Sequence, residues 1–204
     1  AFRQIRASVK AGGGLYVFHS STTQAIFEDA LQANDMEVRS QLIWNKPAGG
    51  LGMGDYRSKH EPFFYAGVKG TAPNFYGDRT HVSVIDFQKS EDQLIRWVKQ
   101  QKIAEKEGRM TIWTMKREPV KDYVHPTQKP VELVMYALAN SSKVEDIVLD
   151  PFLGSGSTLI ACEKTNRLCY GLELDPKYVD VIVQRWVNFT GNRNIKKNGE
   201  GILW

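Results

Sequence analysis

The sequence has few cysteines and no long apolar run. Only two cysteines, Cys162 and Cys169, occur in 204 residues, and their spacing matches neither a zinc site nor a disulfide scaffold. No apolar run is long enough to cross a membrane as a helix, and no secretory signal peptide is visible. The histidines do not cluster at metal-ligand spacing. We therefore expect buried free thiols, no metal site and a cytoplasmic protein.

The composition is that of a globular protein. Hydrophobic residues make up 42% and charged residues 25% of the chain, and both values are ordinary. The length favours one domain, 1–204, with either a full core or a core plus an insert. A net charge of +4 suits a polyanionic partner without requiring one. Most of this charge lies in 67–124, where 11 Lys+Arg and 8 Asp+Glu give 11 − 8 = +3.

Apolar periodicity predicts the order of helices and strands. In the first part we expect strands at 15–18, 37–44 and 61–66, and a helix from Thr22 or Thr23 to Ala33. A helix at 90–107 and a strand at 110–114 follow. After Pro130 the pattern alternates helix, strand, helix, strand, helix, which indicates a parallel sheet. Phe2, Ile5 and Val9 share one helical face with no cap before them, so we expect the chain to begin within an element.

A glycine loop is the most informative stretch. It reads Asp150-Pro-Phe-Leu-Gly-Ser-Gly-Ser-Thr158 and lies between an apolar strand and a helical pattern. This layout lets backbone N–H groups and a helix N-terminus face a small polar ligand. A second predicted strand ends at Glu173, at the spacing where an acidic residue commonly holds ribose hydroxyls. The loop is neither G-x-G-x-x-G nor a phosphate-binding P-loop.

The loop resembles the S-adenosylmethionine loop of DNA amino-methyltransferases, D-P-F-x-G-S-G-[ST]-T. Upstream, His125-Pro-Thr-Gln-Lys-Pro130 resembles the same family's H-P-T-x-K-P segment, in the family's β order. The resemblance covers the chain apart from 67–124, which takes the place of the target-recognition region. It implies an α/β fold: a doubly wound, mostly parallel sheet of the S-adenosylmethionine-dependent methyltransferase type, with a small recognition insert at 67–124.

The resemblance implies a cofactor-binding half at 125–191 that binds S-adenosyl-L-methionine. Asp150 would orient the loop, Phe152 would pack against the adenine, and Glu173 would hold the ribose. Thr127 and Lys129 would reach the cofactor carboxylate, while His125 is equally a turn residue or a ligand. Three of these residues also have purely structural interpretations. Asp150 could be a helix cap, Phe152 a core aromatic residue and Glu173 a surface acid. The remaining loop residues implied are Gly154, Ser155, Gly156, Ser157 and Thr158.

A basic and aromatic patch is the predicted DNA contact. Arg57, Lys59 and His60 precede Phe63-Phe-Tyr65, and such patches bind phosphates and stack on bases. Alternation in a strand places Phe63 and Tyr65 on one face and Phe64 on the other. The partner implied is double-stranded DNA, and a restriction endonuclease or a phage system is left open.

The family's catalytic tetrapeptide, D-P-P-Y or a close variant, is absent from residues 1–204. It should lie some tens of residues upstream, so catalytic residues stay unassigned and 1–204 alone is expected to be inactive. We expect a site-specific methyltransferase that acts on an exocyclic amine, adenine N6 in preference to cytosine N4. Two alternatives remain: an RNA methyltransferase, and a non-catalytic nucleic-acid-binding module that keeps a cofactor pocket.

Overall fold

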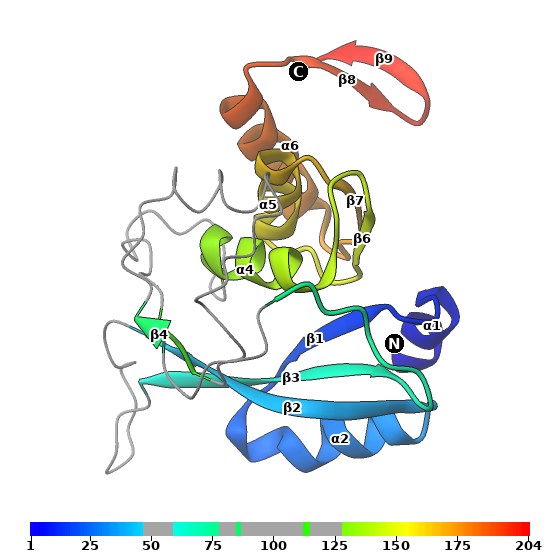
Figure 1. The fold of residues 1–204 in the computed structure, drawn as a ribbon. Helices are drawn as coiled ribbons and strands as arrows, with labels where there is room; N and C mark the ends of the chain where they lie inside the picture. Colours follow the sequence, from blue (N-terminus) through cyan, green and yellow to red (C-terminus); the bar gives the residue numbers. More distant parts are fainter. Residues whose placement is uncertain (47–58, 78–84, 87–111, 115–127) are drawn as a thin grey trace. The chain divides into compact units, whose positions relative to one another are not determined.

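The computed structural model describes residues 1–46, 59–77, 85–86, 112–114 and 128–204, which fall into two units (Figure 1). The first unit comprises 1–117 and 136–143, and the second comprises 118–135 and 144–204. The helix predicted at 90–107 lies outside the described residues.

A five-stranded sheet forms the first unit, in the order β1-β3-β2-β5-β4. Strand β3 runs antiparallel to both β1 and β2, whereas β5 runs parallel to both β2 and β4. The expected strands 15–18, 37–44, 61–66 and 110–114 are therefore confirmed, with shifted ends. The bounds are β1 (Gly14–Phe18), β2 (Met36–Asn45), β3 (His60–Val68), β4 (Ile85–Asp86) and β5 (Ile112–Thr114).

Helices α1 (Phe2–Ser8) and α2 (Gln24–Gln32) supply apolar side chains to one core cluster of this sheet, and a 3-10 turn, η1 (Ser21–Thr23), leads into α2. Leu31 of α2 is fully buried, whereas Ile26 is 67% exposed. The cluster consists of buried Leu15, Leu31, Met36, Phe64 and Ala66, with Phe2, Ile5, Val9, Val17, Phe27 and Val38 packed around it.

An aromatic cluster forms where β1, β3 and β5 meet the C-terminal part of α4 (Val131–Ser141). The Trp113 ring lies edge-on to the rings of Phe63 and Tyr136, with ring centroids 5.0 Å and 4.6 Å apart, respectively. The Tyr16 hydroxyl lies 2.9 Å from Ser141 Oγ, and burial raises the pKa of this tyrosine. Both sides of β3 are therefore packed, because Phe64 belongs to the other cluster.

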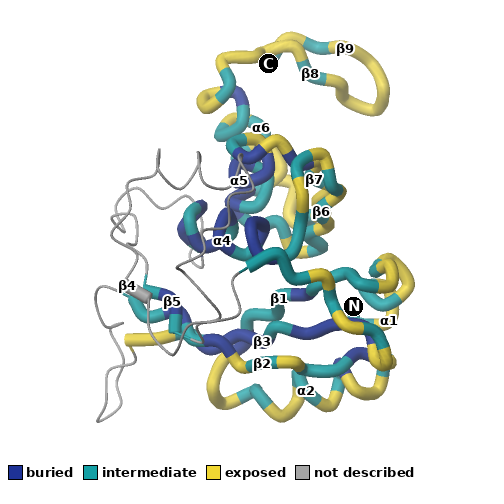
Figure 2. Tube along the Cα trace, in the orientation of Figure 1, coloured by how far each residue is buried: buried dark blue, intermediate teal, exposed yellow. Residues whose placement is uncertain are grey.

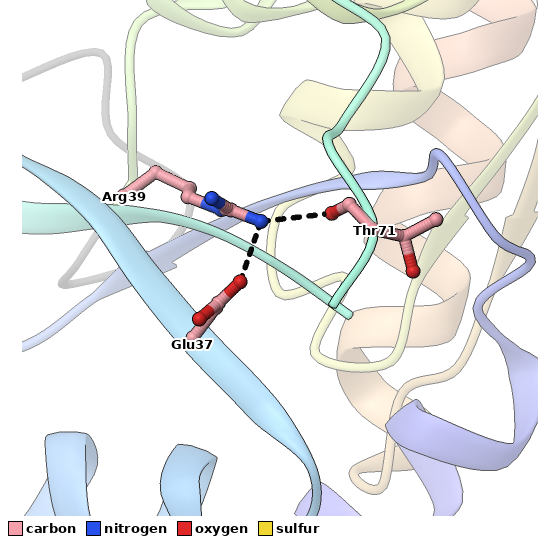
Figure 3. A network of polar contacts seen from close by, with 3 residues as sticks. All are labelled: Glu37, Arg39 and Thr71. Atoms are coloured by element: carbon pink, nitrogen blue, oxygen red, sulfur yellow. Dashed lines mark hydrogen bonds and ion pairs between the residues drawn. The ribbon is translucent and has the colours of Figure 1, made fainter. Parts of the chain in front are cut away.

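A polar contact at the surface ties β2 to the turn after β3. Arg39 pairs with Glu37 at 2.5 Å and donates to the Thr71 carbonyl at 3.0 Å (Figure 3). Both charged side chains are more than a third exposed, so solvent screens the pair and its contribution to stability is small.

The second unit is built around a parallel strand pair. Strands β6 (Ile147–Asp150) and β7 (Leu168–Gly171) pair in parallel, and α5 (Ser157–Thr165) connects them. Helix α6 (Pro176–Thr190) has Pro in its first turn, is capped by Asp175 and ends at Gly191. A hairpin of β8 (Asn194–Lys197) and β9 (Glu200–Leu203) follows.

The two faces of the β6–β7 pair differ. On one face, Val148 and Cys169 are paired in register and half-buried. Cys169 is hydrogen-bonded there to the buried Cys162 of α5. On the opposite face, apolar side chains are exposed within the described residues. These are Ile147 at 66%, Leu149 at 40%, Leu168 at 55% and Tyr170 at 61%. Figure 2 shows exposed stretches along β6 and β7.

Both cysteines are free thiols, as predicted, and the hydrogen bond to Cys169 together with burial raises the pKa of Cys162. No helix in the described ranges is long and apolar enough to cross a membrane. Within the same ranges, no three His, Cys, Asp or Glu side chains gather as metal ligands.

Candidate cofactor-binding site

The glycine loop joins the end of β6 to the start of α5, and Asp150 holds it at both ends. One carboxylate oxygen of Asp150 accepts from the Phe152 N–H at 3.0 Å, and the other accepts from the Thr158 hydroxyl at 2.6 Å. The Leu153 N–H donates to the Leu172 carbonyl at 2.9 Å, which ties the loop to the chain leaving β7. Asp150 therefore fixes the shape of the loop.

Two glycines in the loop have left-handed backbone conformations. Gly154 has φ +55°, and Gly156, at the N-cap of α5, has φ +80°. A Cβ atom on Gly156 would lie 3.2 Å from Ile182 Cγ2 of α6. Position 156 thus needs glycine both for its dihedral angle and for the close approach of α6.

Glu173 lies directly beside the loop. Its Oε2 accepts from the Gly154 N–H at 2.7 Å, and its Oε1 accepts from the Asp175 N–H at 3.0 Å. Each carboxylate oxygen can accept more than one hydrogen bond. The residue that the sequence spacing singled out is therefore placed against the loop.

The N-terminus of α5 directly follows the glycine loop, with Gly156 as its N-cap residue. The structure gives this nine-residue helix no side-chain cap, and the first N–H groups of any helix lack partners within it. Such a terminus carries a partial positive charge and favours an anionic group. Phe152, earlier in the loop, is 69% exposed, so its ring is accessible to a ligand.

Two predicted hydroxyls face the protein interior. Ser155 is 4% exposed and Ser157 is 6% exposed. Ser157 Oγ donates to the Lys129 carbonyl at 2.7 Å, and both serines lie within hydrogen-bonding distance of Arg185 Nη1 on α6. Their burial assigns them to the support of the loop and does not favour direct ligand contact by the hydroxyls.

Sequence reasoning missed Arg185. It lies in the middle of α6, where helical periodicity marks only the apolar inner face, and its partners precede it by about thirty residues. Three residues of the segment before α4 were predicted to bind the cofactor, and the structure describes only one of them, Lys129. Lys129 contributes its carbonyl to Ser157, while His125 and Thr127 lie outside the described residues and stay predictions.

The predicted DNA-contacting residues divide into exposed and buried sets. Lys59 and His60, at the start of β3, are exposed, and Arg57 lies outside the described residues. Tyr65 is half-buried. Phe63 is fully buried and stacks on Phe18 with ring centroids 4.5 Å apart. The expected alternation of Phe63 and Phe64 is present, but burial gives Phe63 a core role and does not support its contact with DNA.

Comparison with protein families and curated proteins gives a consistent result. Residues 1–184 match the N6_N4_Mtase family, described as DNA methylase. The chain is 30% identical over 162 residues to the type II methyltransferase M.Cfr9I of Citrobacter freundii, which covers 76% of this chain and 46% of that protein. It is 26% identical over 196 residues to M.HinfI of Haemophilus influenzae, covering 94% and 51%. The chain therefore spans about half the length of these relatives.

Solved structures confirm the predicted fold class. The M1.HpyAVI–SAM complex matches with a TM-score of 0.67 at 23% identity, over 91% of this chain and 79% of that one. The cytosine-N4-specific PvuII DNA methyltransferase matches with a TM-score of 0.68 at 13% identity, over 95% and 69%. At these identities the likeness concerns the fold. The described strand pairings are more mixed than expected, because three are parallel and three antiparallel.

Proposed function

This chain belongs to the N6_N4_Mtase family of DNA methylases, and on that premise we propose that it carries the cofactor-binding half of a DNA amino-methyltransferase. The whole enzyme would transfer a methyl group from S-adenosyl-L-methionine to an exocyclic amine in double-stranded DNA. The single observation that carries the proposal is the loop 150–158 with Glu173 bonded to the Gly154 amide.

The residues of the site fit this cofactor. The ring of Phe152 is exposed beside the loop and offers an apolar surface for an adenine. Glu173 offers acceptors for ribose hydroxyls, and the uncapped start of α5 suits the carboxylate of the amino-acid part. When bound, S-adenosylmethionine supplies an electrophilic methyl group on a sulfonium centre.

In this proposal the described residues bind and orient the cofactor but do not activate the amine. An exocyclic amine is a poor nucleophile because its lone pair is delocalised into the ring. Acceptors must therefore be held against its hydrogens, and the target base must leave the stack to reach them. Residues 1–204 hold no D-P-P-Y-like tetrapeptide, so we assign this step to chain outside 1–204.

Adenine N6 is the target we propose, and cytosine N4 is the alternative within the same chemistry. Lys59 and His60, exposed at the start of β3, are the described part of the proposed DNA contact. The names of the relatives, type II methyltransferases, support modification of DNA that accompanies a restriction enzyme as the biological setting.

Binding and acceptor choice can be tested separately. Calorimetric titration of 1–204 with S-adenosylmethionine and with S-adenosylhomocysteine should give a saturable one-site isotherm for each. With the complete gene product, methyl transfer should go to duplex DNA and not to RNA of the same sequence. Binding without transfer to either acceptor, by the complete gene product, would favour the non-catalytic alternative.

A further inference from the structure

One guanidinium nitrogen of Arg185, on α6, contacts the residues at the start of α5. Its Nη1 lies 3.1 Å from the Ser155 carbonyl oxygen, 3.2 Å from Ser155 Oγ and 3.3 Å from Ser157 Oγ. Guanidinium groups only donate hydrogen bonds, so the serine oxygens act as acceptors here. A single cation thus holds both buried hydroxyls and a loop carbonyl.

These contacts continue as a directed chain. Ser157 Oγ donates its own proton to the Lys129 carbonyl at 2.7 Å, which leaves its lone pairs to accept from Arg185. Ser157 is the first residue of α5. The chain Arg185–Ser157–Lys129 therefore fixes the position at which α5 begins and, with it, the direction of its first amides.

The positive charge of Arg185 lies beside the N-terminus of α5, although cations usually favour the C-terminus of a helix. A cation next to a helix N-terminus opposes the partial positive charge there, and together the two make this place favourable for an anion. Burial lowers the pKa of Lys164 on α5, and the positive charge of Arg185 lowers it further. The one anionic group of S-adenosylmethionine is its carboxylate.

We propose that Arg185 is a positioning residue: through Ser155 and Ser157 it sets the first turn of α5, and with its charge it favours the carboxylate of the cofactor's amino-acid part. This inference rests on the proposed function, since it names the part of the cofactor that this end of the site receives. It gives Arg185 a role distinct from general stabilisation, because only ligands with the carboxylate should respond.

Two ligands that differ in the amino-acid part, which carries the carboxylate, test this role. S-adenosylhomocysteine has the amino-acid part, whereas 5′-methylthioadenosine keeps the adenosine and thioether without it. In Arg185→Met, affinity for S-adenosylhomocysteine should fall about tenfold or more, because charge-assisted hydrogen bonding is lost, while affinity for methylthioadenosine changes little. Arg185→Lys should recover most of the loss, because it retains the charge and a donor.

A matched control and a second variant keep the result interpretable. Arg193 donates to the Trp204 carbonyl at 2.8 Å in an exposed part of the tail, so Arg193→Met should leave both affinities unchanged. If Arg185→Met unfolds, Ser157→Ala should show the same selective loss. Equal losses for both ligands, or no loss, would overturn the role of Arg185 but leave the proposed cofactor standing. Failure of the unsubstituted chain to bind either ligand would remove both proposals.

Discussion

Glu173 Oε2 accepts a hydrogen bond from the Gly154 N–H at 2.7 Å, which links the end of one strand to the glycine loop after its neighbour. The two residues are nineteen positions apart, and each lies just beyond the carboxyl end of a strand in the parallel pair. Ligands of open α/β sheets bind at this edge. The contact therefore places the acidic residue where a cofactor can reach it and the loop together.

The first prediction concerns the charge of Glu173. Glu173→Gln keeps the size of the side chain but removes its charge, so affinity for S-adenosylhomocysteine should fall by about 1.5–3 kcal/mol. Calorimetry measures the change. Glu200→Gln, at an exposed acid in the terminal hairpin, is the matched control and should bind as the unsubstituted chain does. Unchanged affinity in Glu173→Gln would exclude this carboxylate from the site.

The second prediction concerns Gly156. Gly156→Ala should lower the free energy of unfolding by more than the roughly 1–2 kcal/mol expected for a left-handed non-glycine residue, because its Cβ would also press on Ile182. Gly199→Ala is the control: φ is +88° there, but no atom lies within 4 Å of the added Cβ. Denaturant unfolding of both variants separates the two costs. Equal losses would show that Ile182 yields without penalty.

The third prediction concerns the aromatic cluster. Phe63→Ala should lower the free energy of unfolding by about 3–5 kcal/mol, because it removes a fully buried ring that stacks on Phe18. Phe189→Ala, at a ring 45% exposed, should cost much less in the same unfolding experiment. A stable Phe63→Ala variant with weakened DNA binding would restore Phe63 to the DNA contact and contradict its core role.

The fourth prediction concerns DNA binding. The double variant Arg57→Ala, Lys59→Ala should bind duplex DNA more weakly, and its affinity should depend less steeply on salt, because fewer phosphate contacts release fewer counterions. Fluorescence anisotropy at several salt concentrations gives both quantities. The exposed pair Lys196 and Lys197 in β8, changed in the same way, is the comparison. If only the β8 variant loses affinity, the contact lies on the terminal hairpin.

Much of the second unit could be predicted from local signals. Pro176 and Gly191 mark the ends of α6, and the glycine loop with Glu173 marks the candidate site through residue spacing alone. The β8–β9 hairpin was missed although Asn198-Gly199, with φ +53° and +88°, is a strong hairpin signal. An Asn-Gly pair in a polar tail therefore indicates a strand on either side of it.

Other features depend on contacts that sequence spacing does not encode. Alternation correctly separated Phe63 from Phe64, but β3 lies between β1 and β2 and is packed on both sides, so neither ring faces outward. The directions of the Ser155 and Ser157 hydroxyls depend on Arg185, about thirty positions later. Local patterns thus located the loop, whereas tertiary packing decided which of its groups face a ligand.

If this chain supplies the cofactor half of an enzyme that methylates an exocyclic amine of DNA, the complete gene product must transfer methyl groups to duplex DNA. The decisive measurement is incorporation of tritiated methyl from S-adenosylmethionine into mixed-sequence duplex DNA, followed by nucleoside analysis. We predict incorporation by the complete gene product as N6-methyladenine, and none by residues 1–204 alone. Incorporation as N4-methylcytosine would correct the target base. Robust incorporation by 1–204 alone, or none by the complete gene product, would contradict the proposed division of roles.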